Sequence, residues 1–117
     1  MSRLALAAAL ALACASAANA QSLTEAQARG KALFDGTCGY CHSARGHATV
    51  LLRRRVGEAG ALIAERSNLT PAYIKLAVRR GVMSMPWYRR SELSDDDLAA
   101  ITDYLTRSNP GRGSETK

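Results

Sequence analysis

Apolar residues recur at helical spacing near the start of the chain. Ser22 and Thr24 each fit the first position of a capping box, and an apolar face follows over residues 26–34. The pattern predicts a helix from about residue 24 that ends near Gly36. Gly30 lies on the apolar face, where glycine costs about 1 kcal/mol relative to alanine. Gly30 is therefore either simply tolerated or present because a second backbone approaches closely.

Two further helices are predicted in the second half of the chain. Thr70 suits the N-cap position and Pro71 the first helical position, so a helix should run from Pro71 to Gly81. A last helix should begin at Ser94, where a serine N-cap precedes an acidic first turn. Its apolar stripe is formed by Leu98, Ile101, Tyr104 and Leu105.

The segments between these helices carry weaker patterns. Residues 43–48 are expected to form a loop, and residues 59–66 a short helix. Pro86 disfavours helix at Met85, which predicts a loop over residues 82–88. Because no stretch alternates convincingly as a strand does, we expect an all-α fold of few helices.

The first 20 residues have the pattern of a cleaved secretory signal peptide. Arg3 precedes an apolar run over residues 4–13, and Ala18-Asn19-Ala20 has the form of a cleavage site. The run is shorter than the roughly 20 apolar residues that a membrane span needs. We therefore expect a periplasmic protein without a membrane span. Its domain should cover residues 21–108, and its C-terminal residues 109–117 should form a disordered tail.

The charge indicates the kind of partner. The chain of 117 residues has a formal net charge of +6, and its arginines cluster at Arg53–Arg55, Arg79–Arg80 and Arg89–Arg90. Behind an export signal, such clusters do not favour nucleic-acid binding. They form either a solvated face or a docking surface for an acidic redox protein, which they would steer electrostatically.

The strongest chemical signal is Cys38-Gly39-Tyr40-Cys41-His42. The C-x-x-C-H spacing is that of covalent c-type haem attachment, in which two thiols on one helical turn each bind a vinyl group. A thioredoxin-like pair would instead follow a strand, and a zinc site would need a second ligand pair. The remaining Cys14 lies in the signal segment, in a sequence that faintly resembles a lipoprotein processing site, and His47 is isolated.

His42 is the expected proximal ligand of the iron, and the sixth ligand decides the function. His47 follows His42 too closely to reach the opposite face of a haem. We expect Met85, which Pro86 stiffens, to be the distal ligand of a single haem c. Two alternatives remain: ligation by Met83, or an open site that would make the protein a gas sensor or haem enzyme.

The order of these motifs resembles that of class I c-type cytochromes. A helix with a Gly-x-x-Leu-aromatic pattern, at Gly30, Leu33 and Phe34, precedes the haem motif, and the last helix carries Ile101 and Tyr104. The resemblance implies a class I cytochrome c-like fold in which the first and last helices cross at these residues, and it favours close approach at Gly30. It also implies an electron carrier that is not itself an enzyme.

A second stretch of the sequence resembles one particular group of these cytochromes. Residues 69–75, followed by Arg79, Gly81 and Met85-Pro86, are similar to the small cytochrome subunits of p-cresol methylhydroxylase-type flavocytochromes. This similarity implies a periplasmic dehydrogenase as electron donor, flavin-dependent in that family. Another cytochrome or an oxidase would be the acceptor.

One segment departs from the family pattern. Such cytochromes often carry Gly-x-Gly-Pro soon after the haem histidine, and a carbonyl of that region orients the imidazole. Here the corresponding residues are Gly46-His47-Ala48-Thr49, without proline. The acceptor for the ring N–H of His42 is therefore not identified by the resemblance.

Overall fold

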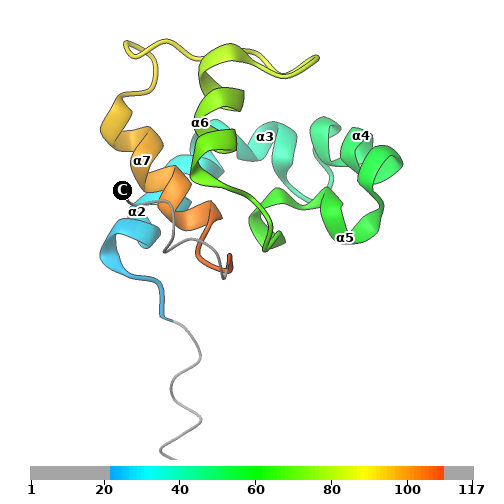
Figure 1. Cartoon of the computed structure of the whole chain (residues 1–117), viewed down its shortest axis with the longest axis horizontal. Coiled ribbons are helices and arrows are strands. Elements are labelled where there is room, and N and C mark those ends of the chain that lie inside the picture. Colours follow the sequence, from blue (N-terminus) through cyan, green and yellow to red (C-terminus); the bar gives the residue numbers. More distant parts are fainter. Residues whose placement is uncertain (1–21, 110–117) are drawn as a thin grey trace, which may run out of the picture.

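The structure is a computed structural model that describes residues 22–109, and these residues are helical (Figure 1). The described part of the chain contains α2 (Glu25–Thr37), α3 (Gly39–His42), α4 (His47–Val56), α5 (Glu58–Ala61), the 3-10 helix η2 (Ile63–Glu65), α6 (Pro71–Arg80) and α7 (Asp95–Leu105). It has no strand, only an isolated bridge between Val82 and Met85. The predicted all-α fold is confirmed.

The predicted signal peptide lies outside the described residues, and so does the predicted tail apart from Asn109. The amide of Asn109 donates a hydrogen bond of 2.6 Å to the carbonyl of Leu69. Among the described residues, no helix has both the length and the apolar character needed to cross a membrane.

Side-chain caps start the three main helices at the predicted places. Thr24 forms a reciprocal capping box with Gln27, while Thr70 and Ser94 accept hydrogen bonds from the third helical residue of α6 and α7. The first helix ends one residue beyond Gly36, close to the predicted end. The helix continues to Thr37 because Gly36 keeps a helical conformation, and the N–H of Cys38 still donates to Phe34 at 2.8 Å.

The segment after His42 differs from its prediction in two respects. The loop expected over residues 43–48 is shorter, since α4 begins at His47. The helix expected over residues 59–66 is divided into α5 and η2 by Leu62, whose backbone is extended (φ −86°, ψ 100°).

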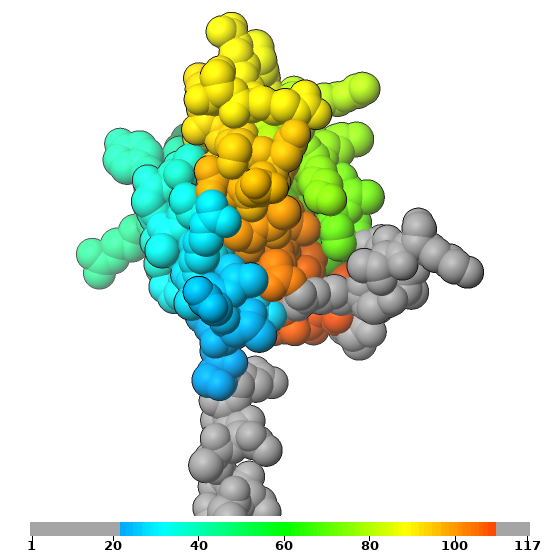
Figure 2. All heavy atoms as spheres, turned by 90° about the vertical axis from the view of Figure 1, so that its left-hand side faces the viewer, coloured from blue at the N-terminus to red at the C-terminus, as the bar shows by residue number. Residues whose placement is uncertain are grey.

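Helices α2 and α7 cross, and they make the most extensive contact between any two described elements (Figure 1). At the crossing, a Cβ added to Gly30 would lie 1.9 Å from the carbonyl oxygen of Ala100, so only glycine fits. The rings of Phe34 and Tyr104 pack with centroids 5.9 Å apart. The expected close approach at Gly30 is confirmed, and the space-filling view shows α7 held between α2 and α6 (Figure 2).

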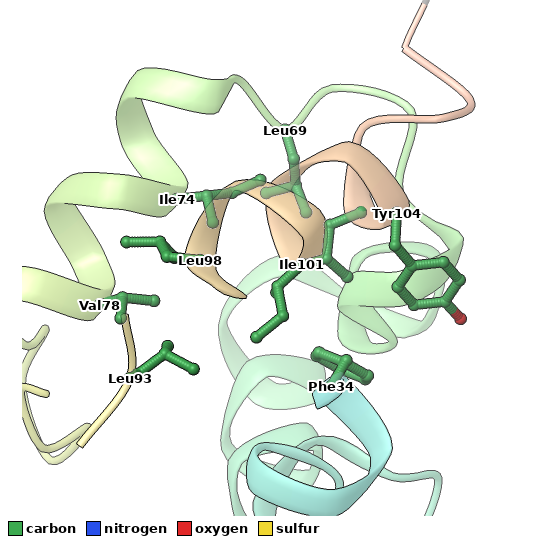
Figure 3. Packing of buried hydrophobic residues seen from close by; sticks show 9 residues of the cluster. Phe34, Leu69, Ile74, Val78, Leu93, Leu98, Ile101 and Tyr104 are labelled. Carbon is green, nitrogen blue, oxygen red and sulfur yellow. The ribbon is translucent and has the colours of Figure 1, made fainter. Parts of the chain in front are cut away.

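The hydrophobic core lies between α2, α6 and α7. The close-up shows side chains from these helices and their flanking loops converging on one another (Figure 3). Its buried members are Phe34, Leu69, Ile74, Val78, Leu93, Leu98, Ile101, Tyr104 and Leu105. Helices α4 and α5 contribute no residue to this cluster; they pack on each other, and α4 also contacts α3.

Candidate functional site

The haem-attachment motif occupies the junction of α2 and α3. Cys38 caps both helices, and its carbonyl accepts hydrogen bonds from the N–H groups of Cys41 (3.1 Å) and His42 (2.9 Å). Both thiols therefore lie on one helical turn, where each is free and partly buried. Within residues 22–109, no group of three or more Cys, His, Asp or Glu side chains is placed to bind a metal ion, so a zinc site of this kind is not formed there.

Burial favours the neutral forms of two side chains in the motif, the thiol of Cys38 and the imidazole of His42. Burial raises the pKa of the Cys38 thiol to about 11, and the neighbouring Cys41 contributes in the same direction. Burial also lowers the pKa of His42, because the imidazolium is poorly solvated there. His42 is therefore a neutral imidazole near pH 7, which is the form that binds metals.

The ring of His42 faces the core beside Phe34, with the two ring centroids 6.4 Å apart. Its Nδ1 atom is buried and has no hydrogen-bond partner in the described part of the chain. An imidazole that binds iron through its other nitrogen carries a proton on Nδ1 and needs an acceptor there. The buried Nδ1 of His42 is therefore available to donate this hydrogen bond if the other ring nitrogen binds iron.

The methionine loop, residues 81–93, places its two methionines differently. Gly81 (φ 72°) and Met83 (φ 56°) both adopt left-handed backbone, and the N–H of Met85 donates to the carbonyl of Val82 at 2.9 Å. As a result Met85 is half-buried and packs against the core cluster. Met83 is 74% exposed, and its sulfur contacts the guanidinium of Arg55.

Arg79 of α6 fixes the far half of the methionine loop. Its guanidinium donates to the carbonyls of Tyr88 (3.1 Å) and Leu93 (3.0 Å) and to the carboxylate of Asp95 (2.7 Å). Hydrogen bonds from Arg90 and then Arg79 lower the pKa of Asp95. Sequence reasoning placed Arg79 in a basic cluster and in the stretch that carries the family resemblance, but it did not identify the hydrogen bonds by which Arg79 holds the loop.

The methionine loop and the haem motif lie close to one another. Burial raises the pKa of Tyr88, and the nearby Cys38 and Cys41 raise it further. Cys38, Met85 and Tyr88 also pack against the same core cluster. His47, by contrast, is exposed at the start of α4. These placements fit a haem whose attachment and proximal side come from the C-x-x-C-H turn and whose distal side comes from Met85.

A basic depression lies beside the methionine loop. It has a volume of about 340 Å³ and is lined by Arg79, Trp87, Tyr88, Arg89 and Arg90. The guanidinium of Arg89 lies 5.1 Å from the centre of the Trp87 ring, as in a cation–π pair. This part of the surface is therefore both positively charged and aromatic.

Comparison with known proteins identifies the class. The sequence profile of the family described as "Cytochrome C oxidase, cbb3-type, subunit III" matches residues 25–105, which includes the whole site. The chain belongs to this family. It is a c-type cytochrome and a haem electron carrier with an all-α, class I cytochrome c-like fold.

A curated relative is similar over much of the same region. The chain is 35% identical over 77 residues to the 4-cresol dehydrogenase (hydroxylating) cytochrome c subunit of Pseudomonas putida. The match covers 66% of this chain and 58% of the relative, so little more than half of the relative's length is represented. No solved structure matches the chain.

Proposed function

We propose that this protein is a periplasmic, mono-haem c-type cytochrome that carries single electrons and catalyses no reaction of its own. Cys38 and Cys41 would hold one haem c covalently, with His42 and Met85 as the axial ligands of its iron. When bound, the haem supplies a one-electron Fe(III)/Fe(II) couple, and methionine ligation raises its potential.

The observation that carries this proposal is the meeting of two segments that are distant in sequence. Cys38 and Met85 contact one core cluster, and Tyr88 lies within electrostatic reach of both thiols. The different burial of the two methionines favours Met85 over Met83, because a distal ligand must point toward the haem rather than toward solvent. The buried, neutral imidazole of His42 meets the requirement for the proximal ligand.

The proposed electron donor is a periplasmic dehydrogenase. Two features support it: the relative from Pseudomonas putida is the cytochrome c subunit of a dehydrogenase, and the sequence resemblance implies a flavin-dependent one. The net charge of +6 and the basic depression would favour docking to an acidic surface on the donor or on an accepting cytochrome or oxidase. The predicted signal peptide, residues 1–20, supports the periplasmic location.

A pair of matched variants tests the ligand assignment. The protein is produced in a bacterium that matures c-type cytochromes, and covalent haem is detected on a denaturing gel. Met85→His should lower the reduction potential while the iron stays six-coordinate, since imidazole replaces a thioether. Met83→His should leave the potential unchanged, because the Met83 side chain is exposed. The reverse result would move the distal ligand to Met83.

A double substitution tests attachment itself. We expect Cys38→Ser, Cys41→Ser to abolish haem staining on the denaturing gel, since serine forms no thioether with the vinyl groups. If wild-type protein carried no covalent haem under the same conditions, the C-x-x-C-H motif would have to serve thiol–disulfide exchange, and the proposal would fail.

A further inference from the structure

Three threonines of the described chain are buried, and one of them lacks a hydrogen-bond partner for its hydroxyl. Thr102 donates to the carbonyl of Leu98 at 2.7 Å, and Thr106 donates to that of Thr102 at 2.8 Å. Both thus bond within α7, as threonines in helices commonly do. Thr49 in α4 is completely buried, with 0% of its surface exposed, yet its Oγ1 has no partner among the described residues.

Thr49 lies on the side of α4 that faces the haem motif. Gly46, the N-cap of α4, is packed so tightly on this motif that an added Cβ would lie 2.2 Å from the carbonyl oxygen of Cys41 and 3.0 Å from the nitrogen of His42. Thr49 follows Gly46 by three residues, which places it on the same side of the helix. A buried hydroxyl without a partner therefore belongs to the helix that abuts His42.

The residues that correspond to the family's proline region, 46–49, begin α4 here, after a short turn over residues 43–45. The carbonyls of α4 are engaged within the helix, beginning with that of Gly46, which accepts from the N–H of Val50 at 3.1 Å. A side-chain acceptor on α4 can take the place of the proline-region carbonyl. The two orphaned polar atoms in this part of the protein are Nδ1 of His42, a donor once the ring binds iron, and Oγ1 of Thr49, an acceptor.

We propose that Thr49 is the positioning residue of the proximal ligand: in the haem-loaded protein its Oγ1 accepts the hydrogen bond from Nδ1–H of His42. The inference rests on the proposed function, because it requires His42 to bind iron through its other nitrogen. The hydrogen bond fixes the ring orientation and makes the imidazole a stronger donor to iron, which favours the ferric state. Thr49 thus replaces the missing proline-region carbonyl.

Substitution of Thr49 tests the proposal through the reduction potential. Thr49→Val keeps the shape but removes the acceptor, so the potential should rise. A hydrogen bond of ordinary strength corresponds to a change of between about threefold and tenfold in the ratio of reduced to oxidised protein at fixed potential. A tenfold change is about 59 mV for a one-electron couple. Thr49→Ser, which retains a hydroxyl, should keep a potential close to that of the wild type.

Thr102→Val is the matched control, because it also removes a buried threonine hydroxyl but one that is bonded within α7. We expect it to lower stability without moving the potential. If Thr49→Val carries covalent haem, remains six-coordinate and has the wild-type potential, the proposal is overturned.

Nuclear magnetic resonance of the reduced wild-type protein provides a test that does not depend on a variant folding. With 15N-labelled histidine, the ring N–H of His42 should give a slowly exchanging signal with cross-peaks to the methyl and β protons of Thr49. The other histidine, His47, is exposed, so its ring N–H should exchange rapidly. Cross-peaks from His42 to a different acceptor, with none to Thr49, would overturn the assignment.

The two proposals fail in distinguishable ways. Wild-type protein without covalent haem, or without histidine ligation, would overturn the proposed function and this inference with it. Wild-type protein with haem and histidine–methionine ligation, combined with an unchanged potential in Thr49→Val, would overturn the role of Thr49 alone.

Discussion

The α2–α7 crossing and the segment from α4 to η2 differ in how they are stabilised. The crossing is close-packed: Gly30 meets the backbone of Ala100, and Phe34 packs on Tyr104. The α4–η2 segment has short helices, three consecutive arginines and few buried side chains; Thr49 and Ala61 are the buried ones. Yet the haem motif lies between the two regions and is in contact with both.

The two regions contact His42 from different sides and affect it in different ways. On one side, Phe34 connects the imidazole to the hydrophobic core, so core packing fixes where the ring lies. On the other side, Gly46, the N-cap of α4, packs closely on Cys41 and His42. Thr49 follows it on α4, and both Oγ1 of Thr49 and Nδ1 of His42 lack a hydrogen-bond partner among the described residues. The first region therefore supplies stability, whereas the second, on our proposal for Thr49, would adjust the electronic environment of His42.

The largest expected effect is that of Phe34→Ala. Phe34 is buried between Tyr104 and His42, and truncation of a buried phenylalanine costs about 3–5 kcal/mol of unfolding free energy. Val56→Ala, at a 50%-exposed position of α4, should change stability by no more than about 0.5 kcal/mol. Denaturant unfolding of the haem-loaded protein measures both, and equal effects would show that the two regions are not stabilised differently.

Two glycines of α2 sharpen the comparison. Gly30→Ala should destabilise by about 1–3 kcal/mol, because its methyl group must push the backbone of α7 away, although alanine favours helix by about 1 kcal/mol. Gly36→Ala has nothing within 4 Å of the added carbon and should stabilise by about 0.5–1 kcal/mol. Opposite shifts in the denaturation midpoint are expected; a stabilised Gly30→Ala variant would mean that the helices do not touch there.

The smallest effect is expected from Asp95→Asn at the start of α7. Hydrogen bonds from Arg90 and Arg79 hold the pKa of Asp95 below its unfolded value of 3.8. Its stabilising contribution is therefore fully present above the unfolded pKa and is lost as the pH falls through the lower folded pKa. Because the Asp95 side chain is 61% exposed, we expect only a slight loss of thermal stability near neutral pH.

The control for Asp95 lies next to it. Asp96 is exposed in the same helical turn and forms no salt bridge within the described chain. Asp95→Asn should flatten the dependence of melting temperature on pH below about 4 more than Asp96→Asn does, because only the Asp95 variant loses the hydrogen bonds from Arg90 and Arg79. Identical curves for the two variants would argue against the Arg79 brace.

Sequence-based prediction was more successful for the three main helices than for the α4–η2 segment. Caps at Thr24, Thr70 and Ser94 were predictable because they depend on local chemistry, and the close approach at Gly30 was implied by the resemblance to class I c-type cytochromes. The break at Leu62 was not predicted, because the leucine itself carries no local turn signal. The ligand residues at Cys38, Cys41, His42 and Met85 remain predictions that the fold accommodates.

Some roles had no sequence signal at all. The brace formed by Arg79 depends on a loop carbonyl at Tyr88 and on Asp95, which only the fold brings together. Thr49 could be recognised only from its complete burial and unpaired hydroxyl, because threonine is common in helices and on surfaces alike. Sequence therefore located the groups that would touch the haem, and structure was needed to find those that position them.

The visible spectra of the wild-type protein, recorded oxidised and then reduced, the reduced form before and after exposure to carbon monoxide, test the central claim most directly. An electron carrier with His42 and Met85 on the iron should be low-spin and six-coordinate, show a methionine–iron band when oxidised, and remain unchanged by carbon monoxide. A high-spin reduced spectrum that shifts readily with carbon monoxide would reveal an open sixth position. That result would contradict the account and identify a gas-binding or catalytic haem protein instead.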